Sequence, residues 1–366
     1  MLLDLRKTLQ ETMDTPLRVV TLLELALQQQ ASDVHLEPVV AGYELRMRAD
    51  GMLLAIEQFD KPTGQSMVTR LMVMAQLLTY RQDLPQEGRM SVLLPTQKTE
   101  LDLRLAIMPT TQGLRAVVRM PAELIEPRRL DALKLSPGVL GVLSQFIGSQ
   151  QGMLLVTGSS GSGKTTTIYA LLDELARQQQ GISIIALEDP VERDLPGVTQ
   201  IQVQPFGELT YERALRSVLR QDPQVLMLGE IRDHQTAALA MGAALSGHRL
   251  IATFHAGSPA GAITRLLEMG IPAYQITSAV FAVMTQRLLR QLGEEGQYHG
   301  RVPVAEIAMM DQPLRTAILN QTDLSTLSRT IDSQPSYEPM SQIAEQMVTV
   351  GMTDTAEVTR ILGANS

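Results

Sequence analysis

The sequence contains no cysteine and no tryptophan, and aromatic residues make up only 3% of the chain. Without cysteine, the chain can form neither a disulfide framework nor a zinc site with thiolate ligands. The absence of disulfides is compatible with a reducing compartment.

Long apolar runs are also missing. A helix needs about 18 to 20 nearly uninterrupted apolar residues to cross a bilayer. The most apolar stretch near the start, residues 17–27, is broken by Arg18 and Glu24. The N-terminus also carries acidic residues and lacks an apolar core followed by a small-residue cleavage site. We therefore expect a cytoplasmic protein that meets a membrane only through a partner.

Basic residues are fewer than acidic ones, 31 against 39. The formal net charge is −8 and the sequence pI is about 5.3, which argues against a surface built to neutralise nucleic-acid phosphates. We expect no direct nucleic-acid partner. Hydrophobic residues make up 44% of the chain, enough for packed cores, and 366 residues predict two or three domains.

Periodicity divides the N-terminal third into two parts. Residues 1–30 show helical spacing of apolar side chains and predict a helical segment. Residues 31–120 predict a small α+β domain: an alternating hairpin with its turn at Asp50-Gly51, a helix whose apolar positions extend to Leu78, and three strands. The expected strands are residues 89–94, 101–108 and 114–120.

A proline-containing segment, residues 121–137, predicts a linker between domains. In the remainder, residues 138–366, short apolar runs alternate with helical stretches, which predicts an α/β domain with a mainly parallel sheet. The expected strands are residues 153–157, 182–187, 225–228 and 250–254. Since ligands bind at the carboxyl ends of such strands, the polar residues after each run are candidate site residues.

The first of these strands is followed by the pattern G-x-x-x-x-G-K-[ST], directly before a helical stretch. Glycine-rich backbone of this kind can curl its N–H groups around a phosphate, while the lysine reaches the β and γ oxygens and the threonine hydroxyl ligates Mg²⁺. A Gly/Ser-rich structural turn is the alternative. The predicted phosphate-binding residues are Gly158, Ser159, Ser160, Gly161, Ser162, Gly163, Lys164, Thr165 and Thr166.

Acidic residues and a histidine follow the other strands. Residues 188–192 hold three carboxylates, Glu230 follows the third strand, and His255 ends the fourth. Each has a structural alternative, such as a helix cap for the acids and a hydrogen-bonded framework role for the histidine. We favour the structural interpretation for His35 and His234 and leave His248 open.

This ordered set closely resembles the secretion and pilus-assembly ATPases, with their Asp box, Walker B and His box. The flanking sequences extend the resemblance to nearly the whole chain from about residue 30. They are Arg220-Gln221-Asp222-Pro223, Gly247-His248, residues 261–266, Gln286-Arg287-Leu288, residues 31–38, Arg48-Ala49-Asp50-Gly51 and residues 85–89 as the family's middle loop.

The resemblance implies a RecA-like P-loop ATPase domain with a smaller N-terminal α+β (PAS-like) domain. It implies ATP and Mg²⁺ as ligands, the metal being held by Thr165 and, partly through water, by the Walker B residue Glu230. It favours Glu192 as the general base, with Glu188 as the alternative. The other implied catalytic residues are Lys164, His255 as a γ-phosphate sensor, and Arg104 and Arg119 as arginine fingers from the N-terminal domain.

The same resemblance implies a homohexamer at the inner membrane, with a membrane platform protein and a cytoplasmic recruitment protein as partners. The four-cysteine zinc module of many assembly-type members is absent between residues 291 and 301, so no zinc is expected. Residues 340–362 resemble the end of assembly ATPases, which favours pilus assembly or type II secretion. The alternatives are a retraction, DNA-uptake or conjugation motor, and a nucleotide-gated scaffold without hydrolysis.

Overall fold

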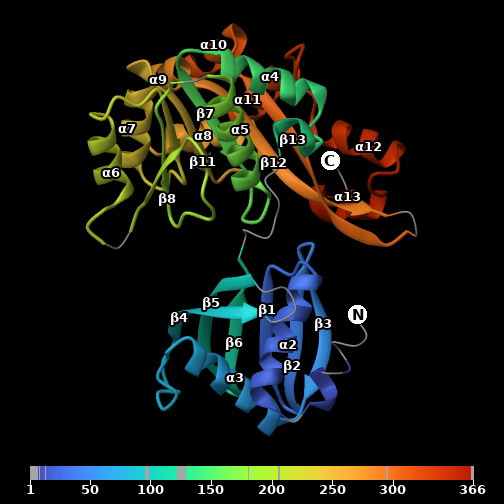
Figure 1. Cartoon of the computed structure of the whole chain (residues 1–366). Coiled ribbons are helices and arrows are strands. Elements are labelled where there is room, and N and C mark those ends of the chain that lie inside the picture. The colour runs from blue at the N-terminus through green and yellow to red at the C-terminus, as the bar shows by residue number, and fades with distance from the viewer. Residues whose placement is uncertain are drawn as a thin grey trace. The chain divides into compact units, whose positions relative to one another are not determined.

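The computed structural model describes residues 7, 9–12, 14–94, 99–121, 129–179, 181–204, 207–293 and 296–363. The chain divides into two compact units, Met1–Ile125 and Glu126–Ser366, which are described separately below (Figure 1). Part of the predicted linker, residues 122–128, lies outside the described residues, and so do residues 1–6, 8 and 13 of the predicted N-terminal helical segment.

The N-terminal unit is an antiparallel sheet packed against two helices. Its elements are α2 (Thr15–Gln28), β1 (Asp33–Val39), β2 (Gly42–Ala49), β3 (Met52–Phe59), α3 (Lys61–Met74), β4 (Gln86–Leu94), β5 (Thr99–Thr110) and β6 (Gly113–Arg119). The six strands lie in the order β3-β2-β1-β6-β5-β4, and every neighbouring pair is antiparallel. The predicted hairpin and the three predicted strands are confirmed.

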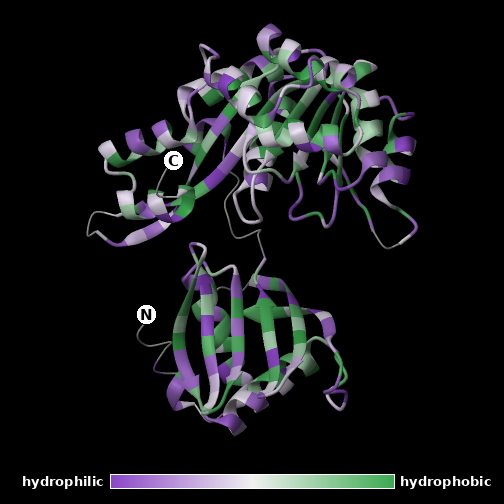
Figure 2. Ribbon diagram, turned by 180° about the vertical axis from the view of Figure 1, so that it is seen from behind, coloured by the Kyte–Doolittle hydropathy of each residue, from purple (hydrophilic) through white to green (hydrophobic). Residues whose placement is uncertain are grey.

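Alternation along the strands decides which face of this sheet is buried. Figure 2 shows hydrophobic and hydrophilic residues taking turns along these strands. Leu101, Leu103 and Leu105 of β5 are at most 3% exposed and join one core with Leu22 of α2 and Leu71 of α3. Residues 86–89, which the resemblance describes as a loop, are the beginning of β4.

Helix α3 is shorter than its apolar spacing predicts. It begins after Asp60, whose side chain accepts a hydrogen bond from the Thr63 N–H at 2.9 Å. It ends at Met74 rather than at Leu78, because Gln76 takes a left-handed conformation with φ 57°. The prediction of helix up to Leu78 was therefore wrong at its C-terminal end.

The C-terminal unit is built on a seven-stranded sheet in the order β13-β12-β7-β11-β10-β8-β9. Its strands are β7 (Gly152–Thr157), β8 (Ile184–Glu188), β9 (Thr199–Gln202), β10 (Val225–Leu228), β11 (Arg249–Phe254), β12 (Val280–Leu292) and β13 (Tyr298–Met309). All neighbouring pairs are parallel except β12 and β13. The four predicted strands are confirmed as β7, β8, β10 and β11, with β8 shifted to Ile184–Glu188, whereas β9, β12 and β13 were missed.

Helices flank this sheet. They are η2 (Leu130–Leu133), α4 (Pro137–Gly148), α5 (Lys164–Gln178), α6 (Tyr211–Val218), α7 (His234–Leu245), α8 (Pro259–Glu268), α9 (Ala273–Ala279), α10 (Gln312–Leu319), α11 (Leu324–Asp332), α12 (Met340–Thr349) and α13 (Thr355–Leu362). One core contains residues of α4 and α5, and a second contains residues of α6 to α11. The central strands are buried on both sides, which explains why they read as continuous apolar runs.

Side-chain caps set the first residues of α7 and α8, the helices that follow β10 and β11. The Asp233 carboxylate accepts from the Thr236 N–H at 2.7 Å and starts α7 just after β10. The Ser258 hydroxyl accepts from the Gly261 N–H at 3.1 Å and starts α8 just after β11. Since a cap of this kind contributes about 1 kcal/mol, these short connections are held in place at both ends.

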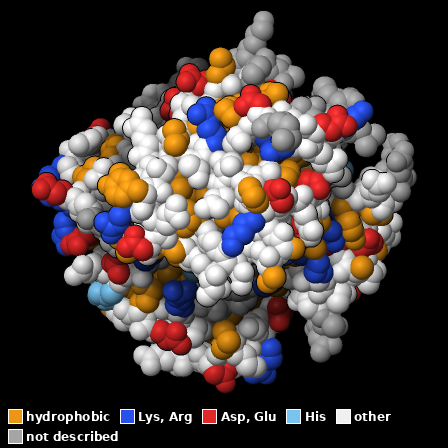
Figure 3. All heavy atoms as spheres, turned by 90° about the horizontal axis from the view of Figure 1, so that it is seen from below, with side chains coloured by type: hydrophobic (Ala, Val, Ile, Leu, Met, Phe, Trp, Pro, Cys, Tyr) orange, Lys and Arg blue, Asp and Glu red, His pale blue; other side chains and the backbone are white. Residues whose placement is uncertain are grey.

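The surface carries charges of both signs. Figure 3 shows acidic and basic side chains interspersed among neutral and hydrophobic ones on one face. Some pair along exposed helices, such as Arg177 with Asp173 at 2.9 Å, and such pairs contribute only a few tenths of a kcal/mol. Within the described ranges, no helix combines the length and apolar character needed to cross a membrane.

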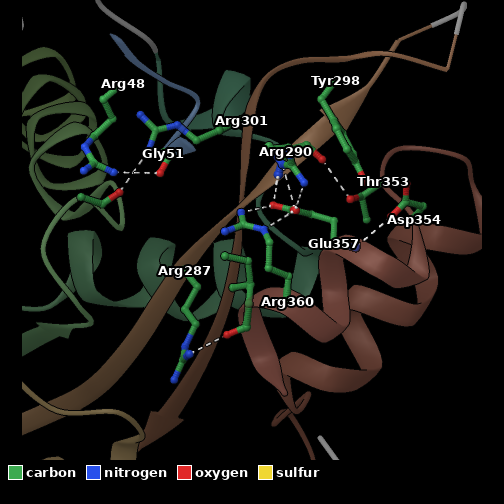
Figure 4. A network of polar contacts seen from close by, with 12 residues as sticks. Arg48, Gly51, Arg287, Arg290, Tyr298, Arg301, Thr353, Asp354, Glu357 and Arg360 are labelled. Carbon is green, nitrogen blue, oxygen red and sulfur yellow. Dashed lines mark hydrogen bonds and ion pairs between the residues drawn. The ribbon is translucent and has the colours of Figure 1, made fainter. Parts of the chain in front are cut away.

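A buried carboxylate attaches the last helix to the long hairpin β12–β13. Glu357 of α13 is fully buried and accepts hydrogen bonds from the backbone and guanidinium of Arg290 and from the guanidinium of Arg360 (Figure 4). Tyr298 donates to Asp354 at 2.6 Å and lies under the Arg290 guanidinium. Burial alone would raise the pKa of Glu357, but the hydrogen bonds from Arg360 and Arg290 outweigh it and lower that pKa to about 2.

We expect Glu357→Ala to lower the melting temperature of the C-terminal unit by on the order of 5 to 10 °C, because it leaves the Arg290 guanidinium without its carboxylate. Hydrogen exchange in α12 and α13 should rise. Glu345→Ala, at an exposed position of α12, is the matched control and should change neither. Equal melting temperatures for the two variants would show that the cluster does not hold α13.

The pH dependence follows from the same group. A lowered folded-state pKa stabilises the structure above the ordinary value of 4.5, and that contribution is lost as the pH falls toward about 2. We therefore expect acid to increase exchange in α13 over this window in the wild-type chain, measured by hydrogen exchange, but not further in Glu357→Ala.

Candidate functional site

The parallel register places several polar segments at one edge of the C-terminal sheet. Strands β8, β10, β11 and β7 are paired in parallel, so their carboxyl ends face the same side. The loop before α5, the 188–192 segment, Glu230 and His255 follow these ends directly. The structure thus brings together residues that are up to about 100 positions apart in the sequence.

The loop between β7 and α5 has the backbone that close approach to a ligand requires. Gly158 has φ 140° and Gly163 has φ 86°, conformations that favour glycine. A Cβ on Gly158 would lie 2.4 Å from the Gln286 carbonyl oxygen, and one on Gly163 would lie 2.8 Å from Gln286 Nε2. Helix α5 then begins at Lys164, so its first N–H groups belong to this loop.

The polar groups of this loop suit a phosphate. Lys164 Nζ donates to the carbonyl oxygens of Gly158 at 2.9 Å and Ser159 at 2.8 Å. Burial lowers the pKa of Lys164, and the negative charge of Glu230 opposes that shift. The Ser162 hydroxyl is buried and has no hydrogen-bond partner among the described residues. A cationic side chain, a helix N-terminus and an unsatisfied hydroxyl are together well matched to an anion.

The remaining predicted loop residues are accessible. Ser159, Ser160 and Gly161 are exposed, and Thr165 and Thr166 in the first turn of α5 are partly exposed. Thr165 is therefore partly accessible at the start of the helix. An oxygen donor such as its hydroxyl, together with the Glu230 carboxylate at the same sheet edge, is chemistry that fits Mg²⁺.

Glu230 and His255 are in direct contact. His255 Nε2 donates to Glu230 Oε1 at 2.7 Å, and Arg232 donates to the other carboxylate oxygen. The Glu230 side chain is 15% exposed and that of His255 is 47% exposed. Glu230 also lines a cavity of about 240 Å³, together with residues that include Tyr211 and Asp233. Two residues predicted separately from different strands therefore form one pair.

The two candidate general bases have different surroundings. Glu188 is 3% exposed, and both its oxygens are engaged, one by the Tyr169 hydroxyl and the other by Gln200 Nε2 at 2.9 Å. Burial raises the pKa of Glu188, and these hydrogen bonds only partly oppose the shift. Glu192 is exposed, and its backbone N–H lies 3.3 Å from the Tyr169 oxygen. Glu188 is thus part of a buried network, whereas Glu192 lies at the surface.

Arg104 and Arg119 belong to the N-terminal unit and are cross-strand neighbours. They face each other in the register of β5 and β6, and both are exposed. Arg119 Nε lies 3.1 Å from Asp33 Oδ1 on β1. The structure therefore places two cationic side chains side by side on that sheet.

Two other histidines, His234 and His248, have hydrogen bonds to backbone carbonyl oxygens. The His234 ring donates through Nδ1 to the Met269 carbonyl oxygen at 2.7 Å, and the His248 ring donates through Nδ1 to the Ala243 carbonyl oxygen at 3.0 Å. Burial and the charge of Arg115 lower the pKa of His35.

Two residues near the site, Tyr169 and Gln286, were given no individual role in the predictions from sequence. Tyr169 bonds Glu188, and Gln286 bonds the loop itself. Gln286 was noticed only as part of the Gln286-Arg287-Leu288 resemblance, since nothing local indicates that it lies beside a loop more than 120 residues away. A strand prediction for residues 280–292 would have located it.

Comparisons with known proteins agree with this geometry. A family model described as "Type II/IV secretion system protein" matches residues 14–360. The type II secretion system protein HxcR of Pseudomonas aeruginosa is 36% identical over 362 residues, which cover 93% of this chain and 76% of that protein. The type IV pilus assembly ATPase PilB of Thermus thermophilus is 39% identical over 269 residues, which cover 74% of this chain and 30% of that protein.

A solved structure shows the same fold. The ATPase DotB of Yersinia pseudotuberculosis aligns with a TM-score of 0.79 at 22% identity, covering 97% of this chain and 95% of that one. The predicted fold class is confirmed: an α/β, RecA-like domain accompanied by a smaller α+β (PAS-like) N-terminal domain.

Proposed function

Since the chain belongs to the type II/IV secretion system protein family, we propose that it is an ATP-hydrolysing motor that binds Mg-ATP at the loop of residues 158–166. The observation that supports this most strongly is the shared sheet edge, where the Lys164 loop and the Glu230–His255 pair follow neighbouring parallel strands. A lysine for the phosphates and an acid for the metal are the parts that phosphoryl transfer requires. The products are ADP and phosphate.

Each residue has a role in this proposal. Lys164 and the N–H groups at the start of α5 bind the phosphates and neutralise the charge that develops in the transition state. Thr165 and, through water, Glu230 would hold Mg²⁺, which would supply further positive charge to the phosphate oxygens. His255 holds the Glu230 carboxylate in place and responds to the terminal phosphate.

We assign the general base to Glu192 rather than to Glu188. A general base must lie within hydrogen-bond reach of the water molecule that it activates. Both oxygens of Glu188 already accept hydrogen bonds inside the protein, and its raised pKa reflects burial. Glu192 follows the same strand end and is exposed, so solvent water reaches this residue.

Glu192→Gln should lower kcat on the order of 10²-fold or more and leave the Kd for ATP nearly unchanged, because it removes a proton acceptor but no phosphate contact. Glu188→Gln should retain most turnover and lower the melting temperature, since it disturbs a buried network. Steady-state phosphate release and thermal melting measure both effects. A larger loss of kcat in Glu188→Gln than in Glu192→Gln would assign the general base to Glu188 instead.

Arg104 and Arg119 are proposed as arginine fingers supplied by the N-terminal domain, residues 31–120. A pair of exposed guanidinium groups on neighbouring strands is suited to a polyphosphate, because arginine binds phosphate oxygens in a fork. In this proposal residues 121–137 act as the linker to the ATPase domain, residues 138–366.

For the assembled machine we propose a homohexamer in the cytoplasm, associated with the inner membrane through a platform protein and a cytoplasmic recruitment protein. The relatives named above work in type II secretion and type IV pilus assembly, which supports extension or secretion over retraction. A pull-down from membranes with and without ATP, followed by identification of the captured proteins, tests the partners. Recovery of a DNA-uptake or conjugation platform instead would reassign the task.

A further inference from the structure

Strand β12 brings a buried glutamine against the loop that holds the phosphate. β12 pairs in parallel with β7, and Thr285 lies opposite Thr157, the last residue of β7, with their hydroxyls 2.8 Å apart. The next residue, Gln286, therefore lies level with the first residue of the loop. Its side chain is 1% exposed.

The Gln286 side chain uses both ends of its amide on this loop. Its Nε2 donates to the Ser162 carbonyl oxygen at 2.9 Å, and its Oε1 accepts from the Thr167 hydroxyl at 2.8 Å. Gly158 and Gly163 also pack so closely on Gln286 that neither could carry a Cβ without a shift. Gln286 thus contacts the loop at three places. They are Gly158 at its start, residues 162 and 163 just before Lys164, and Thr167 in the first turn of α5.

The bond to Ser162 has a consequence for the next peptide group. Peptide bonds are planar and trans, so a carbonyl oxygen and the following N–H point in opposite directions. With the Ser162 carbonyl directed at Gln286, the Gly163 N–H is directed away from β12. N–H groups with a fixed direction are what an anion site at a helix N-terminus needs.

We propose that Gln286 is a positioning residue for nucleotide binding, which fixes the loop in its phosphate-accepting conformation before ATP arrives. The inference rests on the proposed function of this loop and adds a residue outside it. Glutamine is suited to the task because its amide is both donor and acceptor, and both groups are used. The next residue, Arg287, extends from the same strand to the α13 carbonyl oxygen of Ile361 at 2.8 Å.

Gln286→Glu is the sharpest test. Glutamate has the same shape and keeps an acceptor for Thr167, but it loses the donor and sets a carboxylate against the Ser162 carbonyl oxygen. The Kd for Mg-ATP, measured by isothermal titration on the full chain, should rise about 10- to 100-fold, because a buried acceptor is left unsatisfied and the loop is no longer fixed. Thr167→Val, which removes only the second hydrogen bond, should raise Kd less, and Thr167→Ser should restore it.

Gln334→Glu is the matched control. Gln334 is also buried, at 6% exposure, and its Nε2 also donates to a backbone carbonyl oxygen, that of Met309 at 2.7 Å. Gln334→Glu should lower the melting temperature of the nucleotide-free protein as much as Gln286→Glu does. It should leave the Kd for Mg-ATP unchanged. This contrast separates a role in positioning the loop from a role in stability alone.

The outcomes are distinct. A Kd in Gln286→Glu within about twofold of wild type, or an equal rise in Gln334→Glu, would overturn the role of Gln286 and leave the proposed ATPase intact. Failure of the wild-type chain to bind Mg-ATP would overturn both. Should Gln286→Glu not fold, Thr167→Val and Thr167→Ser decide the question alone, and equal affinities for these two would reject it.

Discussion

Lys164→Ala is expected to lower ATP turnover on the order of 10³-fold, close to background. Lys164 is the positively charged group of the loop, and its Nζ already lies within 2.9 Å of two loop carbonyl oxygens, Gly158 and Ser159. Its partial burial strengthens any interaction with a phosphate, and removing such a charge leaves the developing negative charge on the γ-phosphate uncompensated. Steady-state phosphate release with saturating Mg²⁺ measures the effect.

Lys134→Ala provides the control for that experiment. Lys134 is exposed and bonds the Gln291 side chain at 3.2 Å, so the same substitution removes a charge of the same type elsewhere in the unit. It should leave turnover within about twofold of wild type, as expected for a surface contact. Normal turnover in Lys164→Ala would mean that any activity of the preparation comes from another site or another protein.

Glu230→Gln should give a different defect, with ATP still bound but barely hydrolysed. The substitution removes the charge that would organise Mg²⁺ and its waters, yet it keeps the shape of the side chain and an oxygen for the His255 N–H. We expect kcat to fall on the order of 10²- to 10³-fold while Kd changes less than about tenfold. Single-turnover hydrolysis and equilibrium titration separate the two quantities.

Glu212→Gln is the matched control for Glu230→Gln. Glu212 lines the same cavity as Glu230 but forms an exposed pair with Arg216 at 3.0 Å. Its loss should scarcely alter kcat. Were Glu230→Gln to turn over ATP like wild type, the assignment of the Walker B acid to Glu230 would be wrong.

The loop and the strands around it were predictable because their signals are local. β7, β10 and β11 are buried on both sides and therefore appear as uninterrupted apolar runs. The loop of residues 158–165 needs glycine at positions with positive φ and so keeps a recognisable spacing. The proximity of Glu230 and His255 followed from the parallel order of their strands.

Other parts depend on partners that lie far away in the sequence. β12 was missed because Gln286, Arg287 and Arg290 interrupt its apolar pattern. Each is accommodated by a distant group, namely the Ser162 carbonyl, the Ile361 carbonyl and the Glu357 carboxylate. In the same way, residues 188–192 alone do not show that Glu188 is buried and Glu192 exposed, because the burial of Glu188 depends on Tyr169 and Gln200, whose side chains bond its two oxygens.

The most direct measurement is an equilibrium titration of the purified full chain with ATP in the presence of Mg²⁺, in parallel with Lys164→Ala. We expect saturable binding of one nucleotide per chain, lost or weakened at least 100-fold on substitution of the lysine. Absence of saturable binding, or equal affinity in both proteins, would contradict the proposed nucleotide site.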